Sequence, residues 1–62
     1  MTNRLDSIIS VAVNLEREAT LAKVGLSYRQ IDEKGEVILP AGTSAHVEAT
    51  KALLAQLVDL AV

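Results

Sequence analysis

Apolar residues recur at helical spacing in the first third of the chain. Their intervals of three and four predict a helix over residues 4–22, with a stripe of Leu5, Ile8, Ile9, Ala12, Leu15, Ala19 and Ala22. Asn3 is the expected N-cap, because its side-chain oxygen can accept a hydrogen bond from a free backbone N–H. Asp6 in the first turn suits the positive end of the helix dipole. Gly25 is the expected end of the helix, since glycine readily takes the left-handed conformation found there.

The middle of the chain, residues 26–39, predicts a β-hairpin. Two apolar segments flank Asp32-Glu33-Lys34-Gly35, a sequence typical of a type I turn. The expected register pairs Tyr28 with Leu39 and Gln30 with Val37. Alternation then places Leu26, Tyr28, Val37 and Leu39 on one face, and Arg29, Ile31 and Ile38 on the other. An isolated hairpin is marginal in water, so we expect the first face to pack on the helices, with Tyr28 buried there. The second face is the predicted partner-binding surface.

A second helix is predicted over residues 45–60, capped by Thr43 or Ser44. Its apolar positions are Val47, Leu53, Leu54, Leu57, Val58, Leu60 and Ala61. The expected fold class is therefore α+β, a small helix–β-hairpin–helix arrangement in a single domain over residues 1–62.

The two predicted helices carry more apolar surface than one small domain can cover. Each apolar arc spans roughly 200°, against the ~100° that a one-sided surface helix needs. Half of the 62 residues are hydrophobic, yet a chain this short buries only roughly 60% of its unfolded surface. Without cysteine there is no disulfide to stabilise the fold. Oligomerisation is therefore the expected source of additional stability. We expect a homodimer, with an interface at Ile8, Ile9, Leu53, Leu57 and Leu60.

The charges argue against two classes of partner. Six basic and eight acidic residues give a net charge of -2, and the basic residues are scattered, so no nucleic acid is expected. No apolar run reaches the ~18 residues of a membrane-spanning helix, and the first residues do not resemble a signal peptide. We expect a soluble, cytoplasmic protein that has no membrane partner and no cofactor.

Three groups of residues are candidates for chemistry. Gly42, Thr43 and Ser44 lead into a helix N-terminus and could bind an anion, although a plain strand-to-helix turn explains them too. His46 could act as a base, but no nucleophile with an orienting acid is recognisable beside it. Glu16 and Glu18 point about 200° apart on a helix. We interpret His46 as a surface or interface residue and the two glutamates as solvated, so we predict no catalytic or metal site and no enzyme.

The order of elements, the Gly35 turn, the strand that follows it and the Thr43-Ser44 cap resemble the small head–tail connector proteins of tailed phages, the lambda W family. That resemblance implies two antiparallel helices over a hairpin, with copies assembled into a ring.

These observations predict a non-enzymatic, homo-oligomeric protein-interaction module. By analogy with small acidic proteins of bacteria and phages, it would be a regulator or inhibitor. Its client, an unidentified protein, is expected to contact Arg29, Ile31 and Ile38. Two alternatives stay open: a structural assembly subunit such as a phage connector, and a small-ligand or nucleotide binder using Gly42, Thr43 and Ser44 at a subunit interface.

Overall fold

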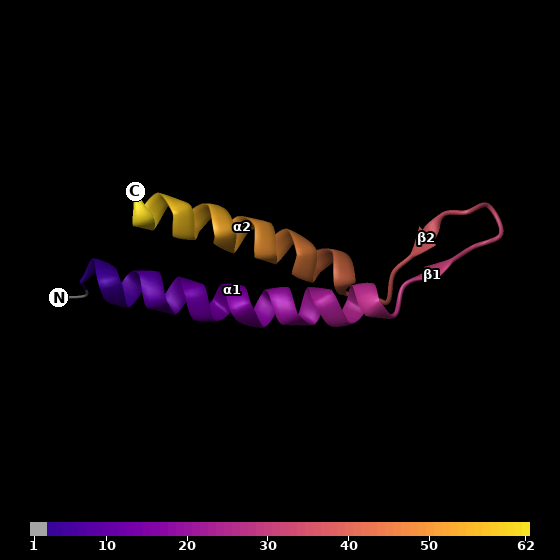
Figure 1. The fold of residues 1–62 in the computed structure, drawn as a ribbon, viewed down its shortest axis with the longest axis horizontal. Coiled ribbons are helices and arrows are strands. Elements are labelled where there is room, and N and C mark those ends of the chain that lie inside the picture. Colours follow the sequence, from indigo (N-terminus) through magenta and orange to yellow (C-terminus); the bar gives the residue numbers. More distant parts are fainter. Residues whose placement is uncertain (1–2) are drawn as a thin grey trace.

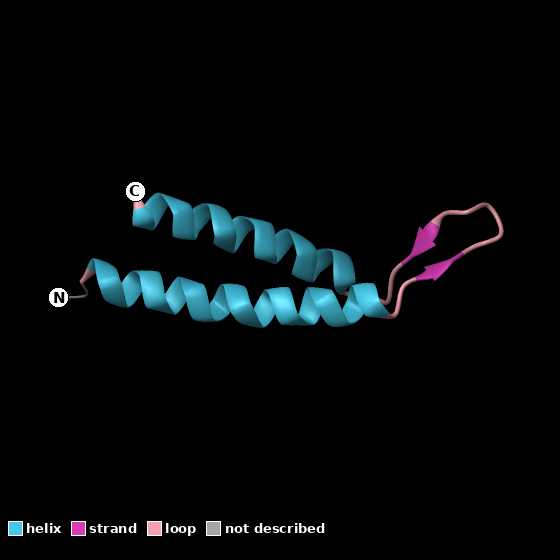
Figure 2. Ribbon diagram, viewed as in Figure 1, coloured by secondary structure: helices cyan, strands magenta, loops and turns pink. Residues whose placement is uncertain are grey.

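The computed structural model describes residues 3–62, which form two long helices connected by a short hairpin (Figures 1 and 2). The elements are α1 (Arg4–Ser27), β1 (Gln30–Ile31), β2 (Val37–Ile38) and α2 (Thr43–Ala61). The helices pack against each other in antiparallel orientation, and the hairpin projects beyond one end of the pair (Figure 1). The predicted helix–hairpin–helix order and the mixed α+β class are thus confirmed.

The start of α1 follows the sequence pattern, but its end does not. The Asn3 side chain accepts a hydrogen bond from the Asp6 N–H at 2.9 Å, which confirms the predicted N-cap. The expected end at Gly25 is wrong, because α1 continues to Ser27 and Gly25 lies within its last turns. A glycine inside a helix costs about 1 kcal/mol relative to alanine, so another contact must favour its presence.

That contact is the close approach of α2 at Gly25. A Cβ atom added to Gly25 would lie 2.2 Å from Oγ1 and 2.6 Å from Cγ2 of Thr43. Thr43, the first residue of α2, is only 2% exposed. Glycine therefore stands at this point of α1 because the Thr43 side chain occupies the space of a Cβ, which is a packing role and not a stop signal.

The same contact changes the start of α2. Gly42 is the N-cap residue, with φ 86, and the helix begins at Thr43, two residues earlier than expected. The predicted side-chain cap by Thr43 or Ser44 is wrong, because both residues lie inside the helix and Thr43 packs against α1. The positive φ of Gly42 lets the chain turn sharply from the hairpin into α2.

At the end of the helix pair away from the hairpin, a basic side chain connects α1 to the end of α2. Arg4, at the start of α1, donates from Nε to the Leu60 carbonyl oxygen at 2.6 Å and from Nη2 to the carbonyl oxygen of Val62. The last carbonyls of a helix lack partners within the helix and carry its negative dipole end. Arg4 thus ties the beginning of the described chain to its end.

The hairpin register differs by one residue from the predicted one. Gln30 pairs with Ile38, and Ile31 pairs with Val37. The Asp32 N–H donates to the Glu36 carbonyl at 2.9 Å, and the Gly35 N–H donates to the Asp32 carbonyl at 3.1 Å. Gly35 has φ 82, the left-handed conformation that adds a bulge residue after a type I turn. This additional residue shifts the register.

The hairpin also does not pack on the helices. Within residues 3–62, the two strands contact each other and neither contacts α1 or α2. Tyr28, expected in the core, is 72% exposed. The expectation was wrong because α1 and α2 cover each other side by side, and the hairpin extends past the end of the pair, where there is no helix to cover it (Figure 2).

The core is confined to a single seam between the helices. Of the described hydrophobic residues, Val11 and Ala22 alone are buried, with 8% and 6% of their surface exposed, and the rest of the seam is half-buried. The molecule measures 54 × 17 × 13 Å, with a radius of gyration of 14.9 Å, whereas a compact domain of this length has about 10.6 Å. The chain is therefore an elongated rod with nearly all of its side chains at the surface.

The Gly25 contact makes a testable prediction. Replacing Gly25 with alanine should improve helix propensity by about 1 kcal/mol, but the new methyl group overlaps Thr43, and overpacking costs about 1–3 kcal/mol. We expect a net decrease in the free energy of unfolding, measured by urea denaturation with circular dichroism. Asn14→Ala, at an exposed position of α1, is the matched control and should be neutral or slightly stabilising. A Gly25→Ala variant as stable as that control would contradict the packing role.

Candidate functional site

The predicted oligomer interface lies largely within the subunit. Ile8 of α1 and Leu53, Leu57 and Leu60 of α2 are half-buried at the spacing of the seam, so they hold the two helices together. Ile9 is the exception, since it is 61% exposed on α1. A role for these residues between copies stays a prediction.

One polar pair interrupts this seam. The Nδ1 of His46 lies 2.6 Å from Oε2 of Glu18, and the Glu18 side chain is only 19% exposed. Because a carboxylate can only accept, the imidazole donates this hydrogen bond. The interpretation of Glu18 as a solvated residue is therefore wrong. Glu16, by contrast, is exposed as expected. The pair joins the middle of α1 to the first turns of α2 and helps to set how the helices align.

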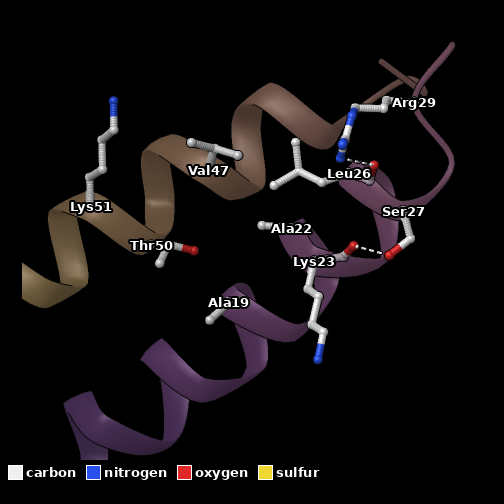
Figure 3. A pocket seen from close by; sticks show the side chains of 9 residues that line it. All are labelled: Ala19, Ala22, Lys23, Leu26, Ser27, Arg29, Val47, Thr50 and Lys51. Atoms are coloured by element: carbon white, nitrogen blue, oxygen red, sulfur yellow. Dashed lines mark hydrogen bonds between the residues drawn. The ribbon is translucent and has the colours of Figure 1, made fainter. Parts of the chain in front are cut away.

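An open groove of about 440 Å³ lies beside the seam, at the end of the helix pair nearest the hairpin. Its apolar lining comes from both helices: Ala19, Ala22 and Leu26 on α1, and Val47 on α2 (Figure 3). Lys23 and Lys51 extend outward from the two helices that form it, and Arg29 lies at the hairpin end. The groove is thus an apolar floor with cations at its margins, and it holds three of the six basic residues of the chain.

The hydroxyl groups of the groove are already engaged. The Ser27 hydroxyl donates to the Lys23 carbonyl at 2.8 Å, and the Thr50 hydroxyl donates to the His46 carbonyl at 2.7 Å. The Arg29 guanidinium donates to the Leu26 carbonyl at 3.1 Å. The two hydroxyl groups are thus bonded to backbone carbonyls, and the remaining lining of the groove is apolar apart from its three cationic side chains.

The apolar lining of the groove continues along both helices. Residues seven positions apart lie on the same side of a helix, and two such rows include groove residues: Leu5, Ala12, Ala19 and Leu26 on α1, and Val47, Leu54 and Ala61 on α2. We call these seven residues the apolar flank. Leu5 and Leu54 are 68% and 51% exposed, so the flank is uncovered in the isolated chain.

One stretch of the other side of the helix pair is mostly polar. On α1, Ala12 and Ser10 lie on either side of the buried Val11, since adjacent helical residues are 100° apart. The hollow on the Ser10 side is lined by Asp6, Ser7, Ser10, Val11, Gln56 and Leu60. Farther along α1 this side also carries apolar residues, since Leu21, eleven residues after Ser10, is 42% exposed.

The predicted partner-binding residues are divided by the observed register. Ile31 shares a face with its cross-strand partner Val37, whereas Ile38 lies opposite Gln30 on the other face. The statement that Ile31 and Ile38 share a face is therefore wrong, because it depended on the incorrect register. Arg29, the third of these residues, lines the groove. A small hollow of about 210 Å³ beside Ile38 is lined by Tyr28, Gln30, Ile38, Leu39 and Pro40.

The predicted anion site is only partly accessible. Gly42 and Ser44 are exposed, but Thr43 is buried against Gly25, and its N–H donates to the Pro40 carbonyl at 3.2 Å. Anion binding at this turn stays a prediction.

Comparison with known protein families, curated proteins and solved structures finds no match to this chain. In residues 3–62, no group of three or more His, Cys, Asp or Glu side chains could hold a metal ion. No helix in this same range is long and apolar enough to cross a membrane.

Sequence reasoning missed the groove and the Glu18–His46 pair. The seven-residue spacing of Leu5, Ala12, Ala19 and Leu26 was a signal for the flank. The pair joins residues 28 positions apart, so only the packing of the helices could reveal it.

The polar pair should contribute measurably to stability. His46→Ala leaves the half-buried Glu18 carboxylate without its donor, and we expect a loss of about 1–3 kcal/mol in the free energy of unfolding. Glu16→Ala, an exposed change on the same helix, should stay within about 0.5 kcal/mol of the unmodified protein. A double-mutant cycle of Glu18→Ala and His46→Ala should give a coupling energy of about 0.5 kcal/mol or more. Simple additivity of the two substitutions would show that the contact does not stabilise the fold.

Proposed function

We propose that this protein is a non-enzymatic, homo-oligomeric protein-interaction module that regulates or inhibits a client protein. Copies associate through the apolar flank of the helix pair, and the hairpin offers a further contact surface. The groove and its engaged hydroxyl groups support binding rather than catalysis.

The observation that carries this proposal is the excess of exposed surface. A folded monomer of 6.6 kDa exposes about 3,900 Å², whereas this chain exposes 4913 Å². The excess of about 1,000 Å² is close to the ~800 Å² that each partner buries in an interface of standard size. Association through the apolar flank would cover part of this excess, including Leu5 and Leu54, which are 68% and 51% exposed.

A structural assembly subunit is the second candidate. The groove and the hairpin are two different surfaces of one copy, and two different contact surfaces allow copies to join head to tail into a ring or filament. This arrangement, together with the resemblance to phage connectors, favours the alternative over a ligand-binding role.

The native mass tests association directly. Light scattering over a range of protein concentrations should give twice the 6.6 kDa of one chain, because two-fold dimers are the commonest closed assembly. A ring or an open series of sizes would favour the assembly subunit. One chain per particle at all concentrations would contradict self-association in both candidates.

The client surface can be tested with two matched substitutions. Ile38 and Leu54 are 50% and 51% exposed, so Ile38→Asp and Leu54→Asp should both leave the helix content unchanged. We expect Ile38→Asp to abolish retention of the proteins that the unmodified chain captures from cell extract, because a charge on the hairpin face disrupts an apolar contact. Leu54→Asp should retain them. The reverse result would place the client on the apolar flank.

A further inference from the structure

We propose that the hairpin of a second copy docks in the groove, with the apolar pair Ile31 and Val37 on the groove floor and the acidic hairpin tip between its lysines. This inference rests on the proposed self-association and names the contact that makes it. In a two-fold dimer the contact occurs twice, since each copy supplies one groove and one hairpin.

The apolar parts of the two surfaces correspond. Ile31 and Val37 are direct cross-strand partners on one face of the hairpin, and they are 67% and 55% exposed. The groove combines the small side chains Ala19 and Ala22 of α1 with the larger Leu26 and Val47 (Figure 3). Small residues in the floor leave room for a branched pair, and burying the exposed Ile31 and Val37 side chains removes apolar surface from water, which favours the contact.

The charges correspond as well. Glu33 and Glu36 flank the turn, and Asp32 uses its Oδ1 atom to accept hydrogen bonds from the Lys34 and Glu36 N–H groups. Among residues 3–62, neither Glu33 nor Glu36 has an ion-pair partner. Lys23 also has no ion-pair partner in that range, and Lys51 holds only an exposed, 3.4 Å contact with Glu48, of a kind worth little. Two unpaired carboxylates on the hairpin thus match two available ammonium groups at the groove.

The lengths and positions allow the contact to be reciprocal. The part of the groove on α1 reaches from Ser27 back to Ala19, about 12 Å of helix at 1.5 Å per residue. Each arm of the hairpin, residues 29–33 and 35–39, can span about 16 Å. Because the groove lies at the hairpin end of the helix pair, two antiparallel copies overlapping at that end place each hairpin along the groove of the other. The distal flank around Leu54 stays outside this contact.

Charge reversal on the two sides gives a specific test. The groove variant is Lys23→Glu with Lys51→Glu, and the hairpin variant is Glu33→Lys with Glu36→Lys. All four residues are exposed, so both variants should keep the circular dichroism spectrum of the unmodified chain. Each variant alone sets like charges against each other at both contacts of the dimer. We expect its dimer dissociation constant to rise by at least about tenfold, which is 1.4 kcal/mol.

Mixing the two variants should restore the dimer. In the heterodimer, the acidic groove of one variant meets the basic hairpin of the other, and the second contact keeps its original charges. Light scattering of the equimolar mixture should therefore return to the mass of two chains. Arg17→Glu and Glu16→Lys reverse exposed charges of α1 outside the groove, and as controls they should leave the dimer unchanged.

The outcomes separate this inference from the proposed function. If the unmodified protein is dimeric but both charge variants remain so, or if mixing does not restore the dimer, the hairpin–groove contact is wrong while self-association stands. If the unmodified protein is monomeric at all concentrations, both proposals are wrong. Masses above two chains would overturn the two-fold closure.

Discussion

Two helices packed side by side can bury only one stripe of each, and in this protein that stripe provides nearly all of the packing. Of the described hydrophobic side chains, Val11 and Ala22 alone are buried, and the hairpin adds nothing to the core because it lies beyond the helix ends. Within residues 3–62 no further helix or sheet packs on the remaining faces of the two helices. The shape, the exposed area and the proposed association all follow from this single seam.

Specific contacts, and not the amount of apolar surface, determine how the helices align. Thr43 occupies the space that a side chain at position 25 would need, which brings the start of α2 close to the end of α1. The His46–Glu18 hydrogen bond lies farther along the seam, and Arg4 binds the carbonyl groups at its far end. An apolar seam alone tolerates sliding, whereas a half-buried polar pair has one alignment in which its members meet. These contacts therefore fix the offset that creates the groove.

The groove joins the fold to the proposed function. The groove lies at the end of the helix pair where the chain continues into the hairpin. One copy therefore carries both an apolar groove with basic margins and an apolar hairpin with an acidic tip. Opposite charges at separate places on one chain favour contact between copies and oppose contact of like surfaces. The proposed arrangement leaves Ile38, on the opposite face of the hairpin from Ile31 and Val37, for a client, which is consistent with a module that binds itself and another protein at different surfaces.

Local chemistry in the sequence determined the order of elements, the N-cap at Asn3, the turn ending at Gly35 and the excess of apolar residues, because each depends on neighbouring residues or on composition. Tertiary contacts decided the rest. Gly25 resembles a helix stop until Thr43 is packed against it, Glu18 resembles a solvated residue until His46 reaches it, and the leucines predicted between copies are half-buried within one. The bulge at Gly35 moved the hairpin register by one residue, which is enough to exchange the faces of a strand. Each of these outcomes depends on which residues meet across a long stretch of chain or across a turn, and helical or strand periodicity alone does not specify such a pairing.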